Sequence, residues 1–81
     1  MEFAELKEEA RDFASLFIKS EEEFLIRFHA QRFRYSAWEW ETLLQLSQLY
    51  AWVMAGEISR REAVLRQKAL LGRFRERRAG L

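Results

Sequence analysis

Residues 36–59, with the sequence SAWEWETLLQLSQLYAWVMAGEIS, contain the most apolar helix candidate of this chain. At about 100° per residue, the apolar side chains of residues 37–55 cover roughly 220° of a helix circumference. The polar stripe that remains consists of Glu41, Gln45 and Gln48. The uncharged run within this stretch, residues 42–56, is 15 residues long and thus shorter than the ~20 residues that a membrane span needs. We therefore predict a helix at 37–55 that lies at the centre of the fold and is covered on several sides.

The same helix-start signal occurs three times, a serine followed three residues later by a glutamate. The three pairs are Ser20 and Glu23, Ser36 and Glu39, and Ser59 and Glu62. In such a capping box, the serine hydroxyl accepts a bond from the glutamate amide, and the glutamate carboxylate accepts one from the serine amide. Gly56 stands where a left-handed residue commonly ends a helix. These signals predict helices near 2–19, 21–34, 37–55 and 60–78. Because no glycine or proline enforces the boundary at Ser20, the first two are alternatively one continuous helix.

Composition indicates an all-α fold. Proline is absent, and Leu, Ala, Glu, Arg and Gln dominate, all of which favour helices. A hydrophobic content of 49% with 12 aromatic residues argues against disorder. A chain of 81 residues is near the lower size limit for a single core. We predict one domain, 1–81, built as a compact bundle of four helices with the third at its centre.

The apolar residues of the first two predicted helices form different patterns. In the first helix they make a narrow core seam of Phe3, Leu6, Ala10, Phe13 and Phe17. In the second they make a broad arc of Phe24, Leu25, Ile26, Phe28, Ala30 and Phe33, with Arg27, Gln31 and Arg34 opposite.

Several classes of function have no residues to support them. The absence of cysteine excludes disulfides, thiolate zinc sites and cysteine nucleophiles. The lone His29 has no partner at the spacing of a helical metal site, and the sequence offers no pair of nucleophile and base or glycine-rich phosphate loop. We predict no catalytic, cofactor or metal site and expect a non-enzymatic protein. The N-terminus lacks the features of a signal peptide, so the expected compartment is the cytoplasm.

The polar sector of residues 37–55 is flanked by two tryptophans. This sector and the two tryptophans together form a set of residues that follow each other at intervals of three or four positions, namely Trp38, Glu41, Gln45, Gln48 and Trp52. Tryptophans around polar groups are typical of a contact surface with aromatic anchors. The alternative is that another helix of the same chain covers this sector. Because dimerisation adds burial to a small chain, we predict a homodimer.

Charge is unevenly distributed along the chain, although the net charge is +1. Residues 1–56 carry 10 acidic and 6 basic side chains, and residues 57–81 carry 3 acidic and 8 basic ones. The basic residues that suit a phosphate backbone are Arg61, Arg66, Lys68, Arg73, Arg75, Arg77 and Arg78. Alternatively, they pair with the acidic face of the first helix, within the bundle or across a dimer. Gly72 either lies inside the last helix or ends it early and leaves 73–81 as a basic tail.

Together these patterns favour a small protein–protein interaction or adaptor module that self-associates. The expected partners are a second copy and an unidentified protein, with no membrane span. The alternative function is nucleic-acid binding through the basic helix at 60–78.

Overall fold

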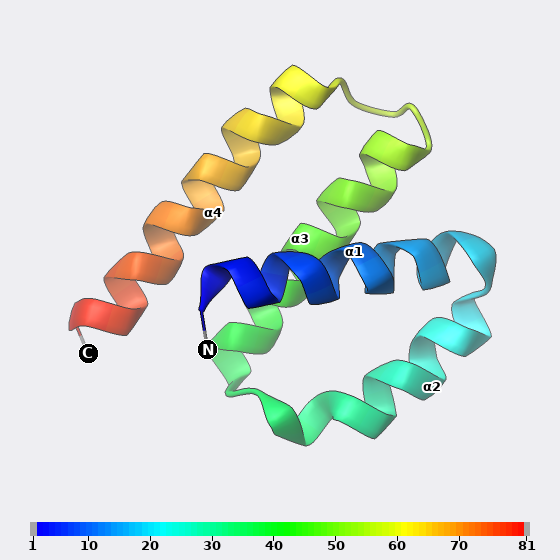
Figure 1. The fold of residues 1–81 in the computed structure, drawn as a ribbon, viewed down its shortest axis with the longest axis horizontal. Coiled ribbons are helices and arrows are strands. Elements are labelled where there is room, and N and C mark those ends of the chain that lie inside the picture. Colours follow the sequence, from blue (N-terminus) through cyan, green and yellow to red (C-terminus); the bar gives the residue numbers. More distant parts are fainter. Residues whose placement is uncertain (1, 81) are drawn as a thin grey trace.

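The computed structural model describes residues 2–80, which are helical throughout apart from short connections and contain no strand (Figure 1). The elements are α1 (Phe3–Lys19), α2 (Glu21–Gln31), the 3-10 turn η1 (Arg32–Arg34), α3 (Ala37–Met54) and α4 (Arg60–Gly80). The predicted all-α fold of four helices is confirmed. Gly72 lies within α4 and does not end it.

Serine caps begin three of the helices. The amides of Glu23, Glu39 and Glu62 donate to the hydroxyls of Ser20, Ser36 and Ser59 over 3.3, 3.4 and 3.1 Å. Within residues 2–80, the reciprocal bond of the capping box is found at Ser36, whose amide donates to the Glu39 carboxylate over 2.9 Å. Ser20 has an extended backbone, with φ −163°. The chain therefore turns there, and α1 and α2 are separate helices.

Gly56 lies at the turn of the helical hairpin formed by α3 and α4. Its φ of 75° lies in the left-handed region that favours glycine. The Gly56 amide donates to the Val53 carbonyl over 3.0 Å, and the Glu57 amide donates to the Trp52 carbonyl over 2.8 Å. This is the bond pattern of a Schellman motif. It reverses the chain so that α4 returns antiparallel to α3 (Figure 1).

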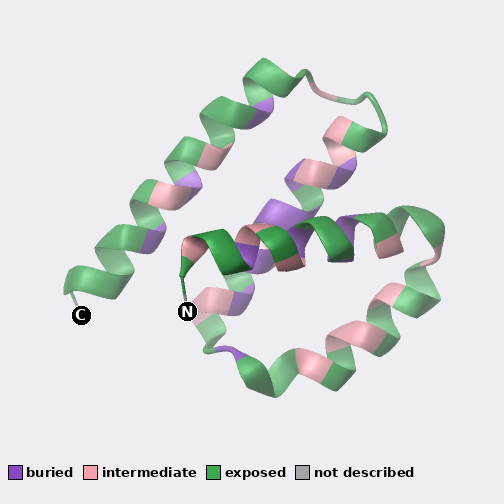
Figure 2. Ribbon diagram, viewed as in Figure 1, coloured by how far each residue is buried: buried purple, intermediate pink, exposed green. Residues whose placement is uncertain are grey.

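Helix α3 packs against both α1 and α4, as predicted for the central helix. Helix α1 crosses one face of α3, and the buried residues of α3 and α4 lie where these helices meet (Figure 2). The buried hydrophobic core comprises Leu6, Ala10, Phe13, Tyr35, Trp40, Leu43, Leu46, Leu49, Ala63, Leu70 and Phe74. Leu43 and Leu46 are fully buried. The apolar face of α3 is therefore the surface on which α1 and α4 pack.

Helix α2 lies at the periphery, and no residue of it is buried. The Arg27 guanidinium lies 3.7 Å from a carboxylate oxygen of Glu9 and 3.7 Å from one of Asp12, both on α1. The predicted apolar arc is consequently split. Phe24 and Phe28 pack on the core, whereas Leu25, Ile26 and Phe33 are exposed on the outside. The acidic side chains of α1 thus hold the basic side of α2 inward.

The predicted seam of α1 is buried in its middle and open at its end. Leu6, Ala10 and Phe13 are fully buried, but Phe17 is 52% exposed. Helix α1 crosses α3 instead of lying along it, so its last turn extends beyond the core (Figure 1). Phe17 therefore belongs to the surface, not to the centre of the core.

Candidate functional site, an exposed strip on α3 between two grooves

The five residues predicted to form a contact surface lie together on the face of α3 opposite Leu43. We call Trp38, Glu41, Gln45, Gln48 and Trp52 the α3 strip. Phe13 and Arg11 of α1 lie against the rings of Trp40 and Tyr50, which flank Leu43 by helix rotation. The strip therefore lies on the side of α3 that α1 does not cover. Glu41 and Gln48 are exposed, and the other three residues are half-buried. The strip is thus a partly open, mainly polar surface with a tryptophan at each end.

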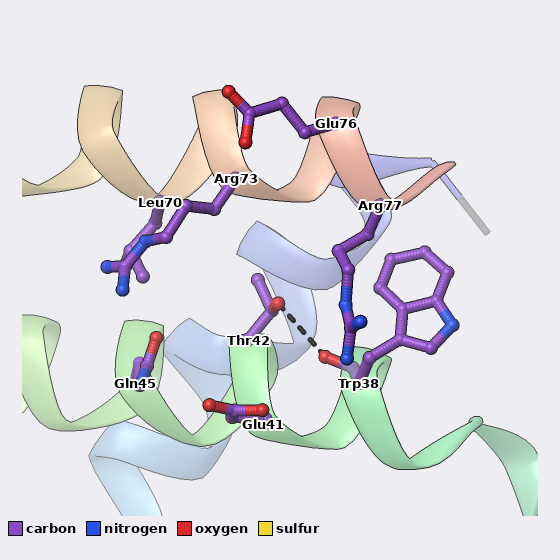
Figure 3. Close-up of a pocket in the computed structure, with 8 residues that line it drawn as sticks. All are labelled: Trp38, Glu41, Thr42, Gln45, Leu70, Arg73, Glu76 and Arg77. Atoms are coloured by element: carbon purple, nitrogen blue, oxygen red, sulfur yellow. Dashed lines mark hydrogen bonds between the residues drawn. The ribbon is translucent and has the colours of Figure 1, made fainter. Parts of the chain in front are cut away.

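A groove between α3 and α4 borders one side of the strip (Figure 3). Its main part, of about 440 Å³, is lined by Trp38, Glu41, Thr42, Gln45, Leu70, Arg73, Glu76 and Arg77. Arg73 and Arg77 extend from α4 toward α3, whereas the Glu76 carboxylate points away from α3 (Figure 3). A further part of about 220 Å³ continues to Trp52, with Arg66 and Ala69 on its α4 side. We call both parts together the basic groove.

Helix α4 covers part of each tryptophan of the strip. The Trp38 ring lies 5.1 Å from the Phe74 ring, measured between centroids. The Arg66 guanidinium carbon lies 5.6 Å from the centre of the Trp52 ring, a cation–π arrangement. The two indoles are therefore held in place by the same chain while part of each remains accessible. Fixed aromatic side chains of this kind lose little entropy when a partner binds.

Tyr50 holds α4 against α3 on the side away from the strip. Its hydroxyl donates to the Gln67 amide oxygen over 2.7 Å. Burial raises the pKa of the Tyr50 hydroxyl above its usual value, although the nearby Arg11 guanidinium lowers it in part. The bond fixes the distance between the helices that wall the basic groove.

An apolar groove of about 540 Å³ borders the other side of the strip. It is lined by Phe17, Ile18, Phe24, Leu44, Ser47, Gln48, Ala51, Trp52, Ala55 and Glu57. Phe17 and Ile18 are 52% and 51% exposed at its edge. Sequence reasoning missed this groove because it assigned Phe17 to the core. The available signal was Ile18, an apolar residue that lies outside the α1 seam.

The basic residues of α4 divide between two of its faces. Arg66, Arg73 and Arg77 line the basic groove. By helix rotation Arg61, Lys68 and Arg75 lie on the face turned away from this groove, which we call the outer face, where Arg75 also lines a groove beside α1. Arg78 pairs with Glu2, and Arg66 pairs with Glu62 over 3.0 Å. Within residues 2–80, the basic side chains with no ion pair are Arg60, Arg61, Lys68, Arg73, Arg75 and Arg77, together with Lys7, Arg11, Lys19 and Arg32 from other parts of the chain.

The acidic side chains Glu9 and Asp12 of α1 pair with arginines of α2 and η1. The Glu9 carboxylate lies 3.7 Å from the Arg27 guanidinium and 3.7 Å from that of Arg34. Pairing of α1 with α4 inside the bundle, one of the two predicted uses of the basic residues, is observed at Arg78 and Glu2, the N-cap of α1, and does not involve Glu9 or Asp12. The charge of the other predicted basic residues, Arg61, Lys68, Arg73, Arg75 and Arg77, remains available for a contact outside the chain.

The described part of the chain contains neither a candidate metal site nor a candidate membrane-spanning helix. Residues 2–80 contain no group of three or more histidine, aspartate or glutamate side chains placed to hold a metal ion. No helix in that range has the length and hydrophobicity needed to cross a membrane. Comparisons of the chain with models of protein families, with curated proteins and with solved structures give no match.

Proposed function

We propose that the protein is a non-enzymatic interaction module of the cytoplasm that self-associates and presents a surface to a protein partner. The α3 strip and the two grooves beside it form the contact surface. The observation that supports this proposal best is their chemistry. Tryptophans, arginines and apolar side chains, the residues that anchor protein interfaces, gather on a face of α3 that the described part of the chain leaves open.

The shape of the molecule also supports association. The Cα atoms extend over 37 × 32 × 14 Å, so the molecule is flat. It exposes 5674 Å² of surface, whereas a compact monomer of 9.8 kDa exposes about 5,200 Å². A net charge of +1 gives little repulsion between copies. Burying a flat face against a second copy removes this excess surface.

The mass of the protein in solution as a function of concentration tests the proposal. The wild-type chain is expected to approach twice its monomer mass as the concentration rises. Trp52→Ala removes an interface anchor and is expected to raise the dissociation constant about tenfold or more. Leu65→Ala is the matched control, because Leu65 is 57% exposed on α4, outside both grooves.

A wild-type chain that stays monomeric at every concentration would contradict self-association. If its tryptophans were also inaccessible to a fluorescence quencher, the strip itself would be ruled out as a contact surface. Trp40, which is 8% exposed, provides the internal reference for a shielded indole.

Nucleic-acid binding is the second candidate, favoured by the unpaired basic residues on the outer face of α4. It predicts retardation of DNA or RNA that weakens steeply with salt. Charge reversal of Arg61, Lys68 and Arg75 is expected to weaken this retardation, with the salt slope falling by about one for each lost phosphate contact. Reversal is a sharper test than deleting 73–81, because that deletion removes Phe74, which is 2% exposed in the core. Retardation with the same strength and salt slope after the triple reversal would reject this candidate.

A further inference from the structure

The residues of the α3 strip follow each other at intervals of three, four, three and four. This spacing is that of a coiled-coil seam, which stays in register with a partner helix along its length. From Trp38 to Trp52 the seam is about 21 Å long, at 1.5 Å per residue. Helix α1 lies on the opposite face, and α4 contacts only the flank. Within residues 2–80, no helix therefore lies directly along the seam.

Opposite charges meet in the basic groove without pairing. Glu41, Arg73 and Arg77 all line it, yet none of the three has an ion pair in the described part of the chain. The guanidinium groups of Arg73 and Arg77 extend toward α3 (Figure 3). A second copy placed on this face would bring its own Glu41, Arg73 and Arg77 to the same groove.

Electrostatics distinguishes the two simplest ways of stacking the copies. In the first arrangement, α3 lies on α3 of the second copy and α4 lies on α4. The basic residues Arg66, Arg73 and Arg77 of the two copies then lie close together. This arrangement is unfavourable because like charges in contact are destabilising. Placing α3 on α4 of the second copy separates these residues. It also brings Glu41 of each copy next to Arg73 of the other.

We propose that two copies pair face to face about a two-fold axis parallel to α3, so that the α3 strip of each lies on the basic flank of α4 of the other. The contact between Glu41 and Arg73 then occurs twice, as a two-fold interface requires. The two hairpins form a four-helix arrangement with α1 on each outer side. The apolar grooves lie at its outer edges and stay open. This inference rests on the proposed self-association and specifies its geometry.

An exchange of charges between copies tests the geometry. Glu41→Arg puts two arginines in each contact, and Arg73→Glu puts two glutamates there. Each single variant is expected to raise the dissociation constant at least tenfold.

An equimolar mixture of the two single variants is expected to recover the wild-type dissociation constant as a heterodimer. One of its two contacts joins the introduced arginine of the first variant to the introduced glutamate of the second. The other contact joins the unchanged Arg73 of the first variant to the unchanged Glu41 of the second. Both contacts therefore hold opposite charges again. Sedimentation equilibrium or native mass spectrometry measures the two variants and their mixture.

Two further variants serve as controls. Arg75→Glu changes the same charge on the outer face of α4 and is expected to leave the dissociation constant unchanged. The double variant with Glu41→Arg and Arg73→Glu on one chain is expected to dimerise like the wild type. Far-ultraviolet circular dichroism verifies that every variant keeps its helical content.

The outcomes separate the two proposals. If the wild-type chain is monomeric throughout, self-association fails and the geometry fails with it. If the wild type dimerises but neither single variant weakens the dimer, or the mixture does not recover it, the geometry is wrong while self-association stands. If the double variant recovers dimerisation and the mixture does not, the contact lies within one chain, which also overturns the proposed geometry.

Discussion

Tyr50 joins the two helices of the hairpin through one hydrogen bond to Gln67. Both residues lie in helices that the sequence predicts, at 37–55 and 60–78, but their pairing depends on how the hairpin closes. Sequence alone places each residue on a helix face and does not connect them. The raised pKa of Tyr50 has the same tertiary cause, because it arises from burial between α3 and α4.

Replacing Tyr50 with phenylalanine is expected to lower the free energy of unfolding by about 1 kcal/mol at neutral pH, through loss of the bond to Gln67. A raised folded-state pKa means that the tyrosine stabilises the fold below the unfolded pKa of about 10. That contribution is lost as pH rises through the folded pKa, because the unfolded chain ionises first. The difference between wild type and Tyr50→Phe should therefore narrow above pH 10. Urea unfolding at a series of pH values measures it.

Tyr35→Phe is the matched control. Burial also raises the pKa of Tyr35, with a further increase from Glu9, but its buried hydroxyl has no hydrogen-bond partner among residues 2–80. The substitution should cost little at neutral pH. An equal loss of stability in both variants at pH 7 would contradict the role given to the Gln67 bond.

At the scale of the helices, the prediction from sequence succeeded because the deciding signals are local. The serine caps and Gly56 act within one helical turn, and they set the boundaries that the structure confirms. The orientation of α2 is not local. Its helical pattern shows an apolar arc, but the acidic residues Glu9 and Asp12 of α1 attract Arg27 to the inner side. An ion pair between helices is not visible in either helix alone.

Gly56 and Gly72 have different backbone conformations, so replacing each by alanine should change the free energy of unfolding in opposite directions. Gly56→Ala is expected to destabilise the fold by about 1–2 kcal/mol, because an alanine at positive φ strains the backbone, although no atom lies within 4 Å of the added Cβ. Gly72→Ala lies inside α4 with equally open surroundings and is expected to stabilise the fold by about 0.5–1 kcal/mol. Urea unfolding measures both. Equal signs for the two substitutions would show that the left-handed turn does not decide the cost at Gly56.

At the scale of the whole molecule, burial is concentrated in α3 and nearly absent from α2. Six residues of α3 are buried, including Leu43 and Leu46, and none of α2 is. Native-state hydrogen exchange is therefore expected to be slowest in the middle of α3 and fastest, among the helices, in α2. Mass spectrometry of peptides from each helix measures the order. Slower exchange in α2 than in α3 would mean that something other than the described core protects it.

The candidate site was only partly accessible from sequence. Helix rotation gathered the five residues of the α3 strip correctly on one face, because that step needs no tertiary information. The basic groove requires the closed hairpin, since Arg73 and Arg77 reach the strip only when α4 lies beside α3. The apolar groove was missed because the crossing angle of α1, which leaves Phe17 and Ile18 outside the core, is a property of the assembled fold.

The central claim is that α3 uses one face for the fold and the opposite face for a second copy. Isotope-filtered NMR on a mixture of labelled and unlabelled chains detects contacts between copies alone. We expect such contacts between the Trp52 and Gln45 side chains of one copy and α4 of the other, with none to Leu43. Two results would contradict the claim. The first is a dimer whose intermolecular contacts avoid the α3 strip, and the second is the absence of any intermolecular contact at concentrations where the wild type is expected to be dimeric.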